Sequence, residues 1–358
     1  MTFAIELSGL TKRYADQVAL AGVDLTVENG AFCVLLGPSG CGKSTLLRAV
    51  AGLEPPTSGA IRLGGKPVAD VAHGVHVAPG MRDLGMVFQS YALWPHKTVR
   101  DNIAWPLKIA GVGKAERRAR LAEVAEMLDI APYLARYPAE LSGGQQQRVA
   151  IARSIAPKPS LLLFDEPLSN LDTQLRVEMR AELLKLHSKT GATIVYVTHD
   201  QVEAMTMATQ IVVMNAGRIE QNGSTASILS DPQTAFVAGF VGNPPANLFA
   251  LRRNGTGWTL GDQAIALQSL PAQHETVRAM VRPSRIGLSD QPGERRLQAR
   301  FVEALPFGAQ HFIQLESNVG RITVLVDDWQ ARDHGSALYV ELPLQPDAVF
   351  DADGARLT

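Results

Sequence analysis

The chain has 358 residues, 46% of them hydrophobic, and a formal net charge of −1. This length suits two folded domains rather than one hydrophobic core. A near-neutral charge argues against a nucleic-acid groove as the main function, and two cysteines, Cys33 and Cys41, are too few for a disulfide framework. The start of the chain lacks the basic and apolar segments of an export signal, and no run approaches the roughly 18 apolar residues that cross a bilayer. We therefore expect a cytoplasmic protein whose membrane role needs a partner.

Residues from Thr2 to about Val27 alternate between apolar and polar side chains, which predicts a small β-layer with a turn around residues 14–17. A strand-like run at 31–36 and a helix-competent run at 44–50 flank the sequence GPSGCGKST, which fits the template G-x-x-x-x-G-K-[ST]. Its glycines let backbone N–H groups turn inward around phosphates, at the positive end of the helix that follows. A glycine-rich turn that carries a lysine by chance is the alternative, and the flanking runs disfavour it. The predicted phosphate-binding residues are Gly37, Pro38, Ser39, Gly40, Cys41, Gly42, Lys43, Ser44 and Thr45.

Glycine-rich turns at 58–59, 64–65 and 79–80 follow, and then a buried strand at 84–88 that ends in Gln89. From about residue 98 to 137 the pattern is helical, which predicts a helical subdomain over about residues 90–155. One face of its charged helix carries Leu121, Val124, Ala125 and Leu128.

Strands and helices then alternate, with apolar strands at 161–164, 193–197 and 211–214. This alternation predicts an α/β fold with a mostly parallel sheet covered on both faces. The helix expected between the first two strands carries apolar residues at i+4 spacing, namely Leu171, Leu175, Met179 and Leu183.

The character of the chain changes near residues 242–247, where two prolines in a polar setting predict a linker. We therefore expect domains at 1–240 and 241–358. The second should be a small all-β barrel or sandwich, because it contains short alternating strands and little helix. The expected strands are 276–282, 301–305, 311–315, 321–326 and 337–342.

The strand at 161–164 runs straight into Asp165 and Glu166. Ligands bind at the carboxyl ends of strands in open α/β sheets, so Asp165 is expected to hold Mg²⁺ beside Ser44. Glu166 would orient or deprotonate an attacking water. On its own, an acidic pair at a strand end is equally well explained as a surface turn. In a chain that also carries a phosphate loop, the surface turn is the weaker explanation.

Gln89 and His199 also follow strands. Alone, each is more simply a strand cap. Together at one sheet edge they favour sensing of the terminal phosphate, with His199 on the γ-phosphate and Gln89 on Mg²⁺ or water.

The stretch 141–148 carries a second anion-binding feature. Ser142 is a helix N-cap by pattern, and Gly143 and Gly144 expose N–H groups at the positive end of the following helix. A flexible cap is the alternative. Since one nucleotide already has its loop at 37–45, a second phosphate-binding helix end suggests that it serves the nucleotide of another copy.

The phosphate loop, Gln89, LSGGQ at 141–145, LLLFDEP at 161–167, SNLD at 169–172 and His199 together resemble the ATP-binding cassette ATPases over about residues 4–239. This resemblance implies a P-loop NTPase-type sheet with an antiparallel β-layer and an inserted helical subdomain. It implies that two copies pack head to tail and hydrolyse ATP with Mg²⁺ between the loop of one and LSGGQ of the other. The catalytic residues would be Lys43, Gln89, Glu166 and His199, and the nucleotide contacts from LSGGQ would be Ser142, Gly143, Gly144 and Gln145.

The resemblance implies two further roles. Tyr14 would stack on adenine, although it also fits an ordinary turn aromatic, and Asp172 would help to couple the two sites. The helical subdomain and residues 91–96 would contact a transmembrane partner.

Residues 175–180, 196–205, 236–245 and 281–284 look like ATPase subunits of bacterial carbohydrate importers of the maltose type. That resemblance implies a C-terminal oligonucleotide-binding-like (TOBE-type) regulatory barrel. It also implies a homodimer, peripheral on the cytoplasmic side of the bacterial inner membrane, that acts with two transmembrane permeases and, indirectly, a periplasmic solute-binding protein.

The expected solute is a sugar or sugar derivative. The sequences at residues 155–159 and 223–227 depart from those commoner in this type. Polyamine, sulfate, ferric iron and glycerol phosphate therefore remain alternative solutes. A soluble cassette acting on ribosomes or DNA is disfavoured by the single cassette, the tail domain and the neutral charge, and no nucleic-acid partner is expected.

Overall fold

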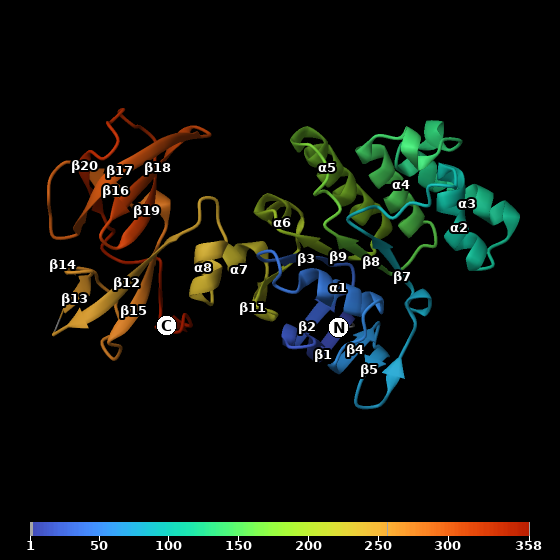
Figure 1. Ribbon diagram of the computed structural model, residues 1–358, viewed down its shortest axis with the longest axis horizontal. Coiled ribbons are helices and arrows are strands. Elements are labelled where there is room, and N and C mark those ends of the chain that lie inside the picture. Colours follow the sequence, from blue (N-terminus) through green and yellow to red (C-terminus); the bar gives the residue numbers. More distant parts are fainter. Residues whose placement is uncertain (1–2, 256, 358) are drawn as a thin grey trace. The chain divides into compact units, whose positions relative to one another are not determined.

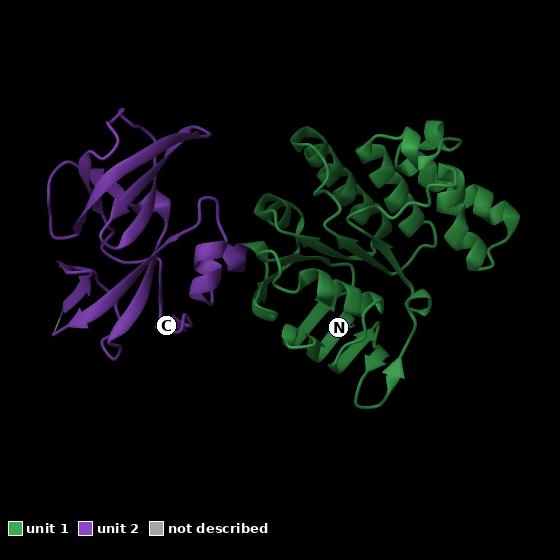
Figure 2. Cartoon of the chain, in the orientation of Figure 1, with its two compact units in different colours: residues 1–225 green, residues 226–358 purple. Residues whose placement is uncertain are grey.

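The computed structural model describes residues 3–255 and 257–357, and the chain divides into two compact units, residues 1–225 and 226–358 (Figure 2). Thr2, with which the predicted β-layer starts, lies outside the described residues. The first unit holds two sheets and a helical part, and the second is mainly β (Figure 1). Among helices of the described residues, none combines the length and apolar character needed to cross a membrane.

The β-layer is an antiparallel sheet in the order β2-β1-β4-β5-β6. It contains three pairings that the sequence prediction missed, β1 with β4, β4 with β5 and β5 with β6, and the first begins at Ser58, where a glycine-rich turn was expected. A Cβ on Gly59 would lie 2.5 Å from the carbonyl oxygen of Gly9, so this glycine serves the close approach of β4 to β1. The strands are β1 (Phe3–Tyr14), β2 (Gln17–Glu28), β4 (Ser58–Leu63), β5 (Lys66–Asp70) and β6 (Val75–His76).

The core sheet has the order β11-β10-β3-β9-β8-β7, and all its pairings are parallel except that of β10 with β11. Every residue of β3, β8 and β9 is buried, as expected for parallel strands covered on both faces. The predicted mostly parallel sheet is therefore confirmed. The strands are β3 (Phe32–Leu36), β7 (Leu84–Val87), β8 (Leu161–Asp165), β9 (Thr193–Thr198), β10 (Gln210–Asn215) and β11 (Arg218–Gly223).

Helix α1 (Lys43–Ala51) lies on one face of this sheet, and α5 (Thr173–Thr190) and α6 (Gln201–Met207) lie on the other (Figure 1). Alternate side chains of the strands explain the division. Cys33 and Leu35 join a core cluster with α1 and the β-layer, whereas Phe32 packs edge-on against His187 of α5. One expectation was wrong: Leu171 lies before α5, because Asp172 caps the helix.

The helical part between β7 and β8 consists of α2 (Val99–Ile109), α3 (Lys114–Met127) and α4 (Gly143–Ile155). The apolar face expected for the charged helix is buried throughout, at Leu121, Val124, Ala125 and Leu128. Short 3₁₀ turns at Ala131–Tyr133 and Pro138–Glu140 carry the chain from α3 to α4.

The second unit begins earlier than the 240/241 boundary expected from the two prolines. Helix α8 (Ala235–Phe240) packs Ala235 and Ala238 against Met280 and Phe350, so it belongs to the second unit. The boundary falls at the first residue of α7 (Thr225–Ser230), which also precedes the linker-like stretch.

Two antiparallel sheets follow and share one apolar core, which agrees with the all-β domain expected there. One sheet contains β12 (Asn247–Asn254), β13 (Gly257–Leu260), β14 (Gln263–Ile265), β15 (Thr276–Val281), β21 (Ala348–Phe350) and β22 (Arg356–Leu357). The other contains β16 (Gly287–Ser289), β17 (Arg296–Phe307), β18 (Gln310–Ser317), β19 (Gly320–Val326) and β20 (Ala337–Glu341).

Candidate functional site

Four adjacent strands of the core sheet, in the order β3-β9-β8-β7, end at one edge. Because they are parallel, the polar residues that follow them gather there. The loop 37–42 follows β3, His199 follows β9, Asp165 ends β8, and Gln89 follows β7 after one residue. The convergence of these strand ends, predicted from the sequence, is confirmed by the strand order. The roles of the individual residues stay predictions.

The loop after β3 is shaped by glycines that have no room for a side chain. A Cβ on Gly37 would lie 2.3 Å from the carbonyl oxygen of Met214, and one on Gly42 would lie 2.5 Å from that of Ala19. Gly42 also caps α1 with a φ of 105°, a conformation that favours glycine. The loop is therefore packed tightly against the end of β10 and against β2, with α1 beginning directly behind it.

Lys43 lies inside this loop and is only 5% exposed. Its ammonium group donates hydrogen bonds to the carbonyl oxygens of Gly37, at 2.7 Å, and Pro38, at 2.9 Å. A buried cation at the start of a helix, next to glycine-rich backbone, is suited to binding phosphate groups.

Ser44 and Asp165 form the link between the loop and β8. The Ser44 hydroxyl donates to the Asp165 carboxylate at 2.7 Å, and the guanidinium of Arg48 lies 3.6 Å from the other carboxylate oxygen. Hydroxyl and carboxylate oxygens are the ligands that Mg²⁺ prefers, and it takes few protein ligands when phosphates and water supply the rest. Within residues 3–255 and 257–357, no group of three or more His, Cys, Asp or Glu is arranged for a metal.

Glu166 and His199 form the second polar pair at the edge. The Glu166 carboxylate lies 3.3 Å from Nδ1 of His199, and the two side chains are 22% and 57% exposed. Glu166 has a φ of 46°, the left-handed region that costs energy for a residue other than glycine, and its N–H bonds to the carbonyl of Val197. A carboxylate held beside an imidazole can orient a water and accept its proton.

The side chain of Gln89 is exposed, and the residue is held through its backbone carbonyl. Asn170 donates from its side-chain amide to the Gln89 carbonyl at 2.9 Å. Beyond it, the guanidinium of Arg153 in α4 donates to the carbonyls of Tyr91, at 2.8 Å, and Ala92, at 2.6 Å. Sequence reasoning missed Asn170 and Arg153, because single polar residues that bind distant carbonyls leave no local pattern.

Ser142 caps α4 as predicted: its hydroxyl accepts from the Gln145 N–H at 3.4 Å, and the Gln145 side chain accepts from the Ser142 N–H at 3.0 Å. Gly144 packs so closely on α5 that a Cβ would lie 2.6 Å from a methyl of Leu175. In the described part of the chain, no hydrogen bond joins residues 142–145 to the loop 37–45.

The two remaining candidates lie at the ends of elements. Tyr14 ends β1 with its ring 43% exposed and the Lys12 ammonium 4.9 Å from the ring centroid. Asp172 accepts a hydrogen bond from the Leu175 N–H at 2.9 Å and so caps α5. These positions leave stacking by Tyr14 and coupling by Asp172 as predictions.

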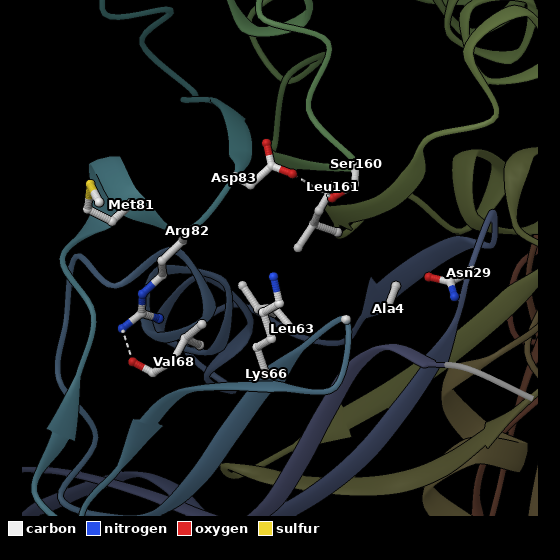
Figure 3. Close-up of a pocket in the computed structure, with 11 residues that line it drawn as sticks. Ala4, Asn29, Leu63, Lys66, Val68, Met81, Arg82, Asp83, Ser160 and Leu161 are labelled. Carbon is white, nitrogen blue, oxygen red and sulfur yellow. Dashed lines mark hydrogen bonds between the residues drawn. The ribbon is translucent and has the colours of Figure 1, made fainter. Parts of the chain in front are cut away.

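A pocket of about 340 Å³ lies at the opposite edge of the core sheet, where Asp83 and Ser160 immediately precede β7 and β8 (Figure 3). Arg82 beside it is buried and donates to carbonyls of Ala49 and Val50 at the end of α1 and to Val68, the contact drawn in Figure 3. Its donors are thus occupied in tying α1 to the β-layer. The residues that follow the core strands, from the glycine loop to His199, lie at the other edge.

Comparison with known proteins identifies the family. A sequence model of the family described as ABC transporter matches residues 20–169, a range that holds the loop at 37–45, Gln89, residues 142–145 and Glu166.

The chain is also similar to named relatives. It is 42% identical over 360 residues to an sn-glycerol-3-phosphate import ATP-binding protein of Rhizobium johnstonii, covering 99% of this chain and 95% of the relative. It is 54% identical over 243 residues to a trehalose/maltose import ATP-binding protein of Thermococcus litoralis, covering 68% of this chain and 65% of the relative.

Among solved structures, a dimeric bacterial ABC transporter cassette matches with a TM-score of 0.55 and 33% identity, covering 62% of this chain and 98% of that one. A post-hydrolysis dimer of that cassette with ADP and phosphate bound gives a TM-score of 0.55 at 32% identity and covers the same shares.

Proposed function

Because the chain belongs to the ABC transporter family of ATPases, we propose that it energises a bacterial importer for a sugar or sugar derivative. The observation that carries the proposal is the pair of side-chain contacts at one edge of the core sheet. The Ser44–Asp165 contact of 2.7 Å and the Glu166–His199 contact of 3.3 Å lie at neighbouring strand ends. The first pair suits a cation bound to a triphosphate, and the second suits a water that attacks the terminal phosphate.

The residues present fit ATP with Mg²⁺. The glycine loop with Lys43 would hold the β- and γ-phosphates, and Ser44 and Asp165, with Gln89, would hold Mg²⁺, which offsets phosphate charge when bound. Glu166 would accept the proton of the attacking water, and His199 would keep that carboxylate oriented and contact the γ-phosphate. Tyr14 would stack on adenine.

The proposed active site takes Ser142, Gly143, Gly144 and Gln145 from a second copy of the chain. Support comes from the capped helix end at Ser142, which within the described residues has no hydrogen bond to the chain's own loop. The similar cassettes of known structure are described as dimeric. Asp172, at the start of α5, would couple the two sites.

In the assembly that we propose, the dimer is peripheral on the cytoplasmic side of the inner membrane. Two permease subunits bind the helical part and residues 91–96, and a periplasmic protein delivers the solute. The contacts of Arg153 with Tyr91 and Ala92 fix the segment after Gln89 to α4. They support the proposal that a movement of the nucleotide site reaches the permeases through this segment.

Two solute classes have support. The Thermococcus litoralis relative, named for trehalose and maltose, favours a disaccharide. The relative from Rhizobium johnstonii, named for sn-glycerol-3-phosphate, is similar over nearly the whole chain and favours that phosphorylated polyol as the second candidate.

The solute is tested by reconstituting the chain in proteoliposomes with the permeases and binding protein of its own operon. We expect ATP hydrolysis that rises when the loaded binding protein is added, with maltose or trehalose as the first ligands and sn-glycerol-3-phosphate as the second. If neither the disaccharides nor sn-glycerol-3-phosphate stimulate hydrolysis, but spermidine or sulfate does, the assignment of the solute is wrong. The assignment of the chain as an importer ATPase would stand.

The composite site is tested with Ser142→Arg. We expect ATP binding to the monomer to stay within about twofold and hydrolysis to stop, because a bulky cation at the helix end blocks the second copy's phosphates. The matched control is Gln146→Arg, one turn into α4 and bonded only to carbonyls of its own chain in the described residues. Loss of binding in the Ser142→Arg monomer would instead place residues 142–145 in the chain's own pocket.

A further inference from the structure

His199 has an unusual position for a residue that must contact a phosphate group. Its side chain is 57% exposed, so packing around the ring does not hold it. Its neighbours along the chain are held instead: Thr198 is 4% exposed at the end of β9, and Asp200 caps α6. The ring itself contacts Glu166 at 3.3 Å, and the backbone that carries it is held by what fixes Thr198 and Asp200.

Thr198 is held by a buried carboxylate. Glu203 of α6, itself 4% exposed, accepts from the Thr198 hydroxyl at 2.7 Å and from the Tyr196 hydroxyl at 2.9 Å. The Thr198 hydroxyl in turn accepts from the Asp200 N–H at 2.9 Å. These hydrogen bonds fix the turn at residues 198–200, which carries His199, to α6.

Asp200 is held from a second side by α5. One of its carboxylate oxygens accepts from the N–H groups of Val202, at 2.7 Å, and Glu203, at 3.2 Å. The other lies 3.6 Å from the guanidinium of Arg176.

Arg176 also reaches in the opposite direction, where it donates to the carbonyl of Leu171 at 3.1 Å. Its Nε is buried without a hydrogen-bond partner among the described residues. The guanidinium therefore links the turn at residues 198–200 to the carbonyl of Leu171.

We propose that Arg176 is a positioning residue for His199: it ties the turn that carries the histidine to the end of the loop 169–172, and so makes the angle of the imidazole depend on that loop. The proposal deepens the proposed function and rests on it for the role of His199. The loop has two further contacts at the site, since Ser169 donates to the carbonyl of Glu166 and Asn170 to that of Gln89. A displacement of this loop by a partner molecule would move Leu171, then Arg176, then Asp200 and the histidine.

The test compares Arg176→Met, which removes the charge at similar volume, with Arg176→Lys, which keeps it. Arg180→Met is the control, because Arg180 lies one turn further along α5 and has no hydrogen bond or ion pair with a described residue. If Arg176→Met does not fold, Asp200→Asn replaces it, because asparagine preserves the cap on α6 and loses the charge that faces Arg176.

The first measurement is the ¹H–¹³C signal of the His199 ring, assigned with His199→Gln in the full chain. It needs no ATP hydrolysis, so it is independent of the proposed function. We expect Arg176→Met to shift this signal, Arg176→Lys to restore it in part, and Arg180→Met to leave it in place. An unmoved signal in Arg176→Met, or an equal shift in Arg180→Met, overturns the proposal.

The second measurement separates positioning from general damage. For Arg176→Met we expect kcat to fall about tenfold, the scale set by a misplaced catalytic group, with KM for ATP within about twofold. Arg176→Lys should recover most of that loss. Equal changes in kcat and in ATP affinity, or no change in kcat, would contradict the positioning role. A wild-type chain that hydrolyses no ATP would overturn the proposed function and leave the ring signal to decide on Arg176.

Discussion

The two halves of the proposed site differ in how they are held. The half that contains Lys43, Ser44 and Asp165 is buried and bonded within its own chain, with Lys43 and Asp165 only 5% and 4% exposed. The half that contains Gln89, Ser142 and His199 is exposed and held through backbone carbonyls, helix caps and flanking residues. The first half is preorganised for phosphates. In the assembly that we propose, the second is the half that a partner would shift.

The largest effect should come from Glu166→Gln, on the border between the halves. We expect kcat to fall about 10²–10⁴-fold, because the amide cannot accept the proton of the attacking water, whereas ATP affinity is kept by the buried half. Turnover and ATP binding measured on the same preparation check this, and gel filtration with ATP should reveal a trapped dimer. A variant that turns over normally would remove Glu166 from the role of base.

Gly37→Ala probes the buried half. Its Cβ would meet the backbone carbonyl of Met214 at 2.3 Å, and backbone cannot move aside as a side chain can. We expect the free energy of unfolding to fall by about 1–3 kcal/mol. ATP binding should weaken at least about tenfold, because the phosphate cradle shifts. Chemical denaturation and nucleotide titration measure the two effects, and Gly80→Ala is the comparison, since Gly80 lies outside the loop, has no positive φ, and a Cβ there meets nothing within 4 Å.

Gly144→Ala probes the exposed half in the same way, with a milder outcome. The Cβ would meet only the Leu175 side chain, with one methyl at 2.6 Å and the other at 3.2 Å, so we expect a loss of up to about 1 kcal/mol of stability. In a Leu175→Ala background the sign should reverse, because alanine is the better helix former by about 0.5–1 kcal/mol. Chemical denaturation of the wild type, Gly144→Ala, Leu175→Ala and the double variant tests this reversal. The same loss in both backgrounds would show that Leu175 is not the obstacle.

The smallest effect is a pH dependence at Glu203. Burial raises the pKa of Glu203, although hydrogen bonds from Thr198 and Tyr196 oppose the shift. The folded chain therefore favours the protonated carboxyl more than the unfolded chain does. The stability that this group contributes is present below its unfolded pKa and is lost as the pH rises through its folded pKa.

Glu203→Gln removes that titration while retaining an acceptor for both hydroxyls. We expect the variant to gain stability relative to wild type as the pH rises from about 4 to 8. Denaturation midpoints across this range measure the gain. A gain that instead shrinks toward neutral pH would mean that the ionised form is the one stabilised in the fold.

Much of the buried half could be predicted from the sequence because its signals are local. The glycine spacing of residues 37–42 and the run from Leu161 into Asp165 both lie within a few residues and indicate the strand, the loop and the sheet edge. The helix cap at Ser142 is local as well, and it was predicted.

The connections of the exposed half could not be predicted in this way. Asn170 to Gln89, Arg153 to Tyr91 and Arg176 to Asp200 each join a side chain to a partner that only the folded chain brings near. Strand β4 was missed for a related reason: Gly59 looks like a turn residue, but it accommodates the backbone of β1.

Lys43 has a consequence for the mechanics of the loop. Its ammonium bridges the carbonyls of Gly37 and Pro38, so the curvature of the loop is braced by a side chain of the loop itself. Replacing Lys43 therefore removes a brace of the peptide together with a positive charge.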